Sequence, residues 1–366
     1  MPAAGTWLGR DIAPLAAPTN LLLDGLVTHE MEALIRAAER SRATYRMQGA
    51  RAWIGGTAEE ILRVASALRG SPGREIIAAC AAQQGPYPRP LVMGILNVTP
   101  DSFSDGGQWM DPGAAVEHAL KMVEDGADVI DIGGESTRPG AVVVPADEEL
   151  ARVLPVLKQL RSQTTAQLSI DTRKSPVAAA CLEAGADWIN DVSGLTYDPA
   201  LAEVVARYPG CRLVLMHSRA RGSAEVYSTE WDDAGRPVYE DVVADTLRWL
   251  RRQAQVAVER GVDPRSLWLD PGYGFGKTYE QNVDLLRRLR EYTSTGLPVL
   301  IGTSRKSSVG KMLGDLPPDQ RLEGTAATVA WAITQRASAV RVHDVREMAR
   351  VAKVTTLLCT DTDTDH

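Results

Sequence analysis

The stretch Leu91-Val92-Met93-Gly94-Ile95-Leu96-Asn97 is an apolar run of strand length that ends in a polar side chain. From here onward the chain repeats one pattern: a short apolar run, a polar or glycine-rich loop, and an amphipathic helical stretch. Eight such runs occur, at residues 91–96, 128–132, 167–170, 188–189, 212–216, 267–269, 299–301 and 339–342. Strands that alternate with helices form parallel sheets that are buried on both faces. Because eight βα units close a barrel, the sequence predicts an α/β fold, a (β/α)8 TIM barrel.

The helix expected after the first run shows the local pattern. Pro112 stands at its first position, where the missing N–H costs nothing, and Ala115 and Met122 fall on one face. Gly126 suits the left-handed conformation that ends many helices. Residues 322–336 form a second, alanine-rich stretch of this kind, for which we expect deeper burial.

The first ninety residues lack this pattern. Two helix-like stretches, 29–43 and 57–68, are separated by Gly55 and Gly56, and the proline-rich stretch 84–90 is typical of a linker. The segment is either a small added α/β unit or an elaboration packed on the barrel. The predicted organisation is an N-terminal extension of unknown role at 1–89, a barrel at 90–358, and a disordered tail at 359–366.

Composition excludes several classes of protein. The formal net charge of -7 argues against a generally basic nucleic-acid surface. The four cysteines, Cys80, Cys181, Cys211 and Cys359, form no C-x-x-C pair, which favours a reducing compartment over a zinc ribbon or a disulfide framework. Neither a signal peptide nor an apolar stretch long enough to span a bilayer is present. We therefore expect a cytoplasmic protein with no membrane and no nucleic-acid partner.

Polar residues follow nearly every predicted strand. In a barrel of this kind, the loops after the carboxyl ends of the strands carry the chemistry. Some of these residues could simply cap the following helices, but capping alone does not explain polar groups at almost every strand end. In strand order they are Asn97, Glu135 to Arg138, Asp171, Asn190 with Asp191, His217, Asp270, Thr303 to Lys306, and Arg341 with His343.

These residue types indicate two kinds of ligand group. Carboxylates such as Asp171 and Asp270 make charge-assisted hydrogen bonds to a heterocycle rich in N–H donors, although each could instead be a helix cap. Arg341 and His343 alternate along a strand and suit an oxyanion such as pyrophosphate. The plainer alternatives are a core histidine at 343 and a solvated surface lysine at Lys306.

The loop at 270–278 contains three glycines and resembles a phosphate-binding loop at first sight. The required pattern places glycine at position 271, where this chain has Pro271, so the match fails. We expect its glycines to let the backbone approach a flat ligand closely. The chain has only two phenylalanines, Phe103 and Phe275, and both lie in loops. They either pack under their loops or stack on an aromatic substrate.

Two long motifs resemble those of the dihydropteroate synthase family. The first is the stretch 91–107, LVMGILNVTPDSFSDGG, and the second is 131–140, DIGGESTRPG. The resemblance covers residues 91–354, and the remaining strand-end motifs follow in the family's order. It implies the condensation of 6-hydroxymethyl-7,8-dihydropterin pyrophosphate with 4-aminobenzoate to give 7,8-dihydropteroate and pyrophosphate in folate biosynthesis. It also implies Mg²⁺ as cofactor, a homodimer, and sensitivity to sulfonamides.

The resemblance carries roles to individual residues. It implies that the pterin is bound by Asp171, Asn190, Met216, Asp270 and Lys306. Pyrophosphate would be bound by Asn97, Ser307, Arg341 and His343, with Asn97 as the metal ligand. The 4-aminobenzoate pocket would be formed by Phe103, Thr137, Arg138, Pro139, Phe275, Lys306 and Ser307. The catalytic set would be Asp105, Arg138, Lys306, Arg341 and His343.

The implied chemistry agrees with these residue types. Pyrophosphate would leave first, in an SN1-like step, because the electron-rich pterin delocalises the developing cation. Mg²⁺, Arg341 and His343 would stabilise the charge that forms on the leaving group. An arylamine is neutral at pH 7 and already nucleophilic, so Asp171 and Asp270 are expected to bind rather than to abstract protons.

Departures from the family leave alternatives open. The stretch 216–222, MHSRARG, is more basic than the family leads one to expect, and 223–241 is hard to align. The nearest enzymatic alternative is a pterin-barrel methyltransferase that uses methyltetrahydrofolate and a corrinoid protein. It would not need the Ser-Thr-Arg-Pro loop, Lys306, or Arg341 with His343. The alternative from another class is a non-catalytic paralogue that only binds pterins or a protein partner.

The first motif yields a direct prediction. If the loop that carries Asp105 closes over the site, Asp105→Ala should abolish most turnover of pterin pyrophosphate and 4-aminobenzoate. Steady-state assay of the purified variant measures this. Turnover equal to that of the unaltered chain would remove the first loop from the mechanism.

Overall fold

The structure, a computed structural model, describes residues 18–23, 28–41, 43–48, 51–57, 60–61, 63–64, 89–99, 112–136, 143–218 and 238–360. The chain divides into two compact units. The first comprises Met1–Tyr87 with Arg287–Leu297, and the second comprises Pro88–Leu286 with Pro298–His366. Each unit is described by itself below.

The second unit is built on a sheet of eight parallel strands. They are β4 (Leu91–Asn97), β5 (Val129–Gly133), β6 (Gln167–Asp171), β7 (Trp188–Asp191), β8 (Arg212–Met216), β9 (Leu267–Asp270), β10 (Leu300–Ile301) and β11 (Ala339–Val342). Their order is β10-β11-β4-β5-β6-β7-β8-β9. A parallel bridge between Leu269 and Val299 joins the two ends of this order, so the sheet closes into a barrel. The predicted (β/α)8 TIM barrel is confirmed, and each strand lies at its predicted run.

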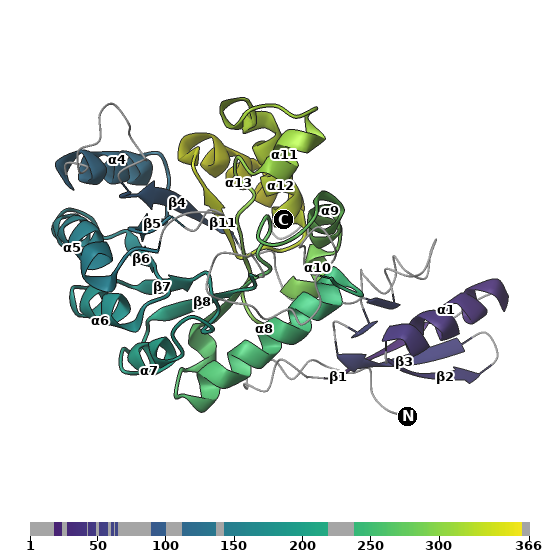
Figure 1. Cartoon of the computed structure of the whole chain (residues 1–366). Coiled ribbons are helices and arrows are strands. Elements are labelled where there is room, and N and C mark those ends of the chain that lie inside the picture. The colour runs from purple at the N-terminus through teal and green to yellow at the C-terminus, as the bar shows by residue number, and fades with distance from the viewer. Residues whose placement is uncertain are drawn as a thin grey trace, which may run out of the picture. The chain divides into compact units, whose positions relative to one another are not determined.

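Helices follow the strands along the outside of the barrel. They are α4 (Pro112–Glu124), α5 (Ala146–Gln163), α6 (Ser175–Glu183), α7 (Ala200–Ala206), α8 (Val242–Glu259), α9 (Tyr279–Arg287), α11 (Ser307–Met312), α12 (Leu322–Thr334) and α13 (Val345–Cys359). Figure 1 shows α4 to α7 on the outer side of strands β4 to β8. Short 3-10 helices at Pro264–Ser266 and Pro318–Gln320 complete the connections.

Helix α4 forms as its sequence predicts. Ala115 and Met122 are buried on one face, and Gly126 ends the turn after the helix at a φ of 107°. The buried face packs closely on β4, since a Cβ added to Gly94 would lie 2.9 Å from the Met122 Sδ and 3.0 Å from the Val345 Cγ2. Glycine at 94 therefore allows α4 and α13 to pack against the first strand.

Large apolar side chains fill the amino-terminal half of the barrel. One buried cluster consists of Met93, Val129, Trp188, Val214, Trp268, Leu300 and Ala339, most of which stand at or near the start of their strands. The ring centroids of Trp188 and Trp268 lie 4.6 Å apart, and the Trp188 Nε1 donates to the Gln167 Oε1 at 2.6 Å. Such layers make a TIM barrel a packed core rather than a pore. The carboxyl ends of the strands are left for polar groups.

The first unit contains a three-stranded antiparallel sheet with the order β1-β3-β2. Strand β1 (Pro18–Leu23) is followed by helix α1 (Thr28–Ser41), then by β2 (Thr44–Gln48) and β3 (Arg51–Thr57). The predicted helix at 29–43 is confirmed as α1, which buries Leu34, Ala37 and Ala38. Gly55 and Gly56, expected between two helix-like stretches, lie within β3 and pair with β1, and the described residues 60–61 and 63–64 beyond them are helical. Helix α10 (Leu289–Thr293) falls within the Arg287–Leu297 part of this unit.

Two further expectations concern a membrane span and segments that lie outside the described residues. Among those residues, no helix combines the length and the apolar character that a membrane span requires. The expected disordered tail after Cys359 lies outside the described residues from 361 onward, as does the part at 223–237 of the stretch 223–241, which is hard to align.

Candidate active site

The register of the sheet places four residues in one row at the carboxyl ends of neighbouring strands. Asn97 pairs with Gly133, Gly133 with Asp171, and Asp171 with Asn190. Gly133 adds no side chain to the row, and a Cβ built there would lie 3.6 Å from both the Asn97 Oδ1 and the Asp171 Cβ. The barrel thus brings together strand-end residues that lie far apart in the sequence.

Arg341, from β11, pairs with Met93 and reaches this row with its side chain. Its Nε donates to the Asp131 Oδ2 at 2.6 Å, and its Nη2 donates to the Asp171 Oδ2 at 2.9 Å. The Asn190 Nδ2 donates to the same Asp131 oxygen at 3.0 Å. The Ser169 Oγ donates to the other Asp131 oxygen at 2.5 Å. A buried network of hydrogen bonds therefore joins strands β5, β6, β7 and β11.

The charges of this network shift one another's pKa values. Burial raises the pKa of Asp171 to about 7, against the opposing effect of Arg341. Burial alone would lower the pKa of Arg341, but the carboxylates of Asp131 and Asp171 outweigh it and raise that pKa. The Asp171–Arg341 pair thus keeps a permanent cation beside a carboxyl group that titrates near neutral pH.

Lys306 occupies a second part of the strand-end region, after β10. Its Nζ donates to the backbone carbonyl of Tyr273 and lies 4.6 Å from the centre of the Phe275 ring. Burial lowers the pKa of Lys306 to about 8, although Asp270 opposes the shift. Burial likewise raises the pKa of Asp270, and Lys306 is the largest opposing influence. Lys306, Phe275 and Asp270 therefore form one electrostatic group.

The glycines of the loop after β9 allow close approach to the protein itself. Gly272 and Gly274 have φ angles of 68° and 83°. A Cβ at Gly272 would lie 1.8 Å from the His217 carbonyl oxygen, and one at Gly274 would lie 2.8 Å from the Lys306 Cδ. We expected these glycines to admit a flat ligand, whereas the approach that the structure shows is to His217 and Lys306.

The remaining predicted residues lie at or near strand ends. Met216 is buried at the end of β8, and Ser307 is exposed at the first position of α11. The His343 Nδ1 lies 3.0 Å from the Ser304 Oγ, so its partner differs from those of Arg341. The predicted residues Phe103, Asp105, Thr137, Arg138 and Pro139 lie outside the described residues.

Sequence reasoning missed Asp131. It lies in the middle of β5 and has no exposed surface, yet it accepts hydrogen bonds from Arg341, Asn190 and Ser169. The available signal was a carboxylate inside the apolar run at 128–132, where a parallel strand normally has only apolar side chains.

A buried ionic cluster behind the strand ends was also missed. Glu135 accepts from the Arg173 Nη2 at 3.1 Å and from the Lys174 Nζ at 2.6 Å, and Lys174 also donates to Glu149. Although burial opposes it, Lys174 and Arg173 lower the pKa of Glu135. Glu135 further accepts from the Val144 backbone N–H at 3.1 Å. The cluster therefore fixes residues on both sides of 137–142 in the sequence.

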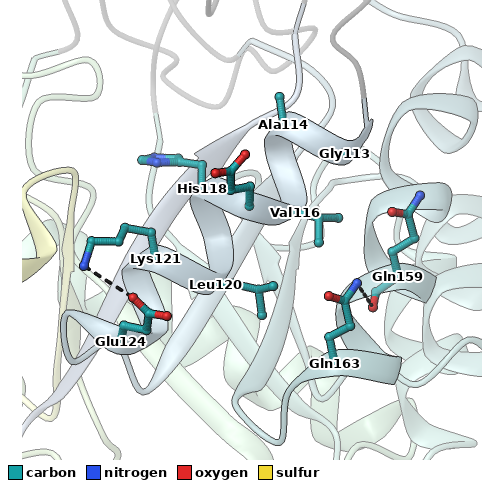
Figure 2. Close-up of a pocket in the computed structure, with 10 residues that line it drawn as sticks. Gly113, Ala114, Val116, His118, Leu120, Lys121, Glu124, Gln159 and Gln163 are labelled. Carbon is teal, nitrogen blue, oxygen red and sulfur yellow. Dashed lines mark hydrogen bonds and ion pairs between the residues drawn. The ribbon is translucent and has the colours of Figure 1, made fainter.

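A surface cavity of about 820 Å³ lies elsewhere, on the helical layer. Residues of α4 and α5, with His118 and Gln159 among them, line it (Figure 2). None of the predicted site residues borders it. Among the described residues, no cluster of three or more His, Cys, Asp or Glu side chains could hold a metal ion.

The family model described as "Pterin binding enzyme" matches residues 93–343. Dihydropteroate synthase from Bacillus subtilis is 46% identical over 264 residues, which cover 72% of this chain and 87% of that protein.

The chain belongs to the dihydropteroate synthase family. Among solved structures, Xanthomonas albilineans dihydropteroate synthase with 4-aminobenzoic acid is 44% identical, with a TM-score of 0.67, and the match covers 74% of this chain and 93% of that one. Yersinia pestis dihydropteroate synthase in a sulfonamide drug complex is 42% identical, with a TM-score of 0.66, and the match covers 74% and 94%. The sequence-based expectation of a dihydropteroate synthase, a transferase of folate synthesis, is confirmed.

The position of Asp131 leads to a prediction about stability. Asp131→Asn should lower the free energy of unfolding by about 3 kcal/mol, because it leaves the partly buried Arg341 guanidinium without one of its two carboxylate partners. In an Arg341→Met background the same substitution should cost less than half as much, since the unpaired charge is gone. Urea unfolding of the four proteins measures both effects.

A matched control is available at the surface. Asp263 pairs with Arg265 at 2.7 Å, and both side chains are largely exposed. Asp263→Asn should leave unfolding unchanged, because exposed ion pairs contribute little. Equal losses from Asp131→Asn with and without Arg341 would contradict the pairing described above.

Proposed function

We propose that this chain condenses 6-hydroxymethyl-7,8-dihydropterin pyrophosphate with 4-aminobenzoate, giving 7,8-dihydropteroate and pyrophosphate. The observation that carries the proposal is the row of buried polar strand-end groups centred on Arg341, within a barrel of the dihydropteroate synthase family. Such a row offers a donor-rich ring several acceptors and places a permanent cation beside them.

Pterin binding is assigned to Asp171, Asn190, Asp270 and Lys306, with Met216 lining the pocket. Asp171 and Asn190 are neighbours in the sheet and are both nearly or fully buried. Buried carboxylates bind N–H groups strongly, because no water competes for the same hydrogen bonds. The apolar side chain of Met216, 3% exposed, supplies a surface on which a flat ring can lie.

The departure of pyrophosphate is assigned to a second set of residues. Arg341 and His343 come from β11 and the residue after it, and Asn97 and Ser307 are the further predicted contacts. A cation and N–H donors near the leaving group stabilise the negative charge that develops as the C–O bond breaks. The neutral arylamine then attacks the exocyclic carbon, and its proton is lost after the C–N bond forms.

Binding of 4-aminobenzoate is assigned to Phe275, Lys306 and Ser307, with Phe103, Thr137, Arg138 and Pro139 completing the pocket. The Lys306 ammonium lies 4.6 Å from the centre of the Phe275 ring, at a distance where a cation is attracted to the face of an aromatic ring. The same ammonium therefore suits the aromatic ring of 4-aminobenzoate. A sulfonamide would compete for this pocket, and the Yersinia pestis dihydropteroate synthase forms a complex with a sulfonamide drug. Sulfamethoxazole should therefore raise the apparent KM for 4-aminobenzoate without changing the maximal rate.

Mg²⁺ is the cofactor that we propose. Asn97 offers a neutral oxygen donor at a strand end, and the described residues contain no cluster of three metal-ligating side chains. This fits an ion that keeps several waters and is bound mainly by substrate phosphates. When bound, Mg²⁺ would neutralise charge on the pyrophosphate. Removing it with EDTA should abolish turnover, and adding excess Mg²⁺ should restore it.

The direct test is an assay of the purified chain with pterin pyrophosphate and Mg²⁺. Pyrophosphate and dihydropteroate should form in equal amounts, and only when 4-aminobenzoate is present. The comparisons do not favour the methyltransferase or the non-catalytic paralogue. Methyl transfer from methyltetrahydrofolate, or no product at all from folded protein, would overturn the proposal.

The pKa values of the site predict its pH dependence. Below about pH 7 Asp171 becomes neutral, and above about pH 8 Lys306 loses its proton. Both groups are charged only between these values, so kcat/KM should pass through a narrow maximum there. Lys306→Arg should remove the alkaline limb, because a guanidinium does not titrate in this range. A limb that stays near pH 8 in this variant would assign it to another group.

We also propose that the chain is a homodimer. Helices α12 and α13 expose Trp331 at 45%, Val354 at 57%, Leu357 at 63% and Leu358 at 82%. Such apolar exposure on two neighbouring helices is typical of a surface that is covered in the assembly. Leu358→Glu should shift the sedimentation coefficient towards that of a monomer at micromolar concentration. Val143→Glu, at a 43% exposed residue of the loop before α5, is the control.

The proposed location is the cytoplasm. Cys181, Cys211 and Cys359 are free thiols. Burial raises the pKa of Cys181 and of Cys211 to about 12, so neither reacts readily. Free cysteines without disulfides agree with a reducing compartment.

A further inference from the structure

The loop at 271–277 keeps one conformation only if side-chain contacts hold its backbone. Gly272, Gly274 and Gly276 all have left-handed φ angles, of 68°, 83° and 59°. Glycines give a backbone more freedom than any other residue, so the loop has many conformations available before it is fixed. Yet it carries the Tyr273 carbonyl and the Phe275 ring, which are the contacts of Lys306.

Lys277, at the end of the loop, provides such a constraint. Its Nζ donates to the Gly272 carbonyl at 2.9 Å and to the Phe275 carbonyl at 3.0 Å. It lies 3.1 Å from the His217 Nδ1. An ammonium has three N–H donors, and the His217 carbonyl oxygen, at 3.4 Å, is a further and more distant acceptor beside these three partners. Lys277 thus holds both ends of the glycine-rich turn from one point.

His217 connects this point to the barrel wall. It follows β8 directly, is fully buried, and packs edge-to-face on Trp249 with ring centroids 5.0 Å apart. Because an ammonium can only donate, the contact between the Lys277 Nζ and the His217 Nδ1 is a hydrogen bond only when that nitrogen carries no proton. The loop passes directly against this residue, since a Cβ at Gly272 would lie 1.8 Å from its carbonyl oxygen.

Lys277 and Lys306 both donate hydrogen bonds to backbone carbonyls of the same turn. Lys277 bonds to the carbonyls of residues 272 and 275, and Lys306 bonds to that of Tyr273 between them. The peptide between Tyr273 and Gly274 is also held by Asn282, whose Oδ1 accepts from the Gly274 N–H at 2.7 Å. Lys277 fixes the carbonyls on either side of this peptide and thereby helps to position the Lys306 ammonium. The sequence alone assigned no role to either Lys277 or His217.

We propose that Lys277 is a positioning residue, which, through the carbonyls of Gly272 and Phe275 and through the His217 ring, places Phe275 and Lys306 for 4-aminobenzoate. The identity of the affected substrate rests on the proposed function. The placement of Phe275 does not, and it can be measured in the absence of any substrate.

The kinetic test uses Lys277→Met, which keeps the length of the side chain and removes every donor. The KM for 4-aminobenzoate should rise about tenfold, as expected for the loss of charged hydrogen bonds. The KM for pterin pyrophosphate should rise clearly less, since three of its five assigned contacts, Asp171, Asn190 and Met216, lie on other strands. Lys277→Arg should recover most of the loss. Lys121→Met, at an exposed position of α4, should change neither constant.

A spectroscopic test is possible because the chain has only two phenylalanines. Protein labelled with 4-fluorophenylalanine should give two 19F resonances, and Phe275→Leu identifies that of Phe275. Lys277→Met should shift or broaden the Phe275 resonance and leave the Phe103 resonance unchanged. His217→Leu should have the same effect, and His217→Asn, which keeps an acceptor near the Nδ1 position, should have a smaller one.

The outcomes separate this inference from the proposed function. An inactive unaltered chain would remove the proposed function, and the 19F spectra would still decide whether Lys277 positions Phe275. An unchanged Phe275 resonance in Lys277→Met would overturn the inference, even in an active enzyme. Equal rises in both KM values without recovery in Lys277→Arg would also overturn it. If Lys277→Met does not fold, the KM values and the 19F spectra can both be measured on His217→Leu instead.

Discussion

The ion pairing of Arg341 with Asp131 and Asp171 is the constraint on which the site depends. Two buried carboxylates share one guanidinium, so the group carries about one negative charge when both are ionised. Burial and the neighbouring carboxylate make that charge costly, and the pKa of Asp171 rises towards neutral as a result. A ligand that donates hydrogen bonds to Asp171 relieves this cost. The same electrostatic tension therefore favours a ring with several N–H groups over a second anion at that position.

Two kinds of contact support this network, one apolar and one ionic. Towards the amino ends of the strands, Trp188, Trp268 and their neighbours form a buried apolar layer. Outside the strand ends, the Glu135–Lys174–Glu149 contacts add buried charges of opposite sign. Breaking one partner of such a pair is costly, so the strand ends of β5 and β6 are fixed independently of any ligand.

Much of this fold could be predicted from the sequence, because parallel strands buried on both faces are short apolar runs with polar ends. Asn97, Asp171 and Asn190 were found in this way, and the register confirms that they are neighbours. The role of Asp131 could not be found, because its partner Arg341 lies 210 residues away and is reached only when the barrel closes. The strand that contains Gly55 and Gly56 could not be predicted for a related reason. Pairing with β1 overrides the local preference of glycine against strand. The glycines of the loop after β9 were recognised, but which atoms they approach depends on the neighbouring strand.

The closure of the barrel has a mechanical consequence. Between β9 and β10 the backbone is joined by one isolated bridge, from Leu269 to Val299, and β10 itself has only two residues. Asp270 is the last residue of β9 and Lys306 follows β10, and each shifts the pKa of its counterpart. A ligand that contacts both would supply cross-links where the backbone provides fewest. Occupancy would then stiffen the barrel along its seam, so that the substrate completes part of the wall that encloses it.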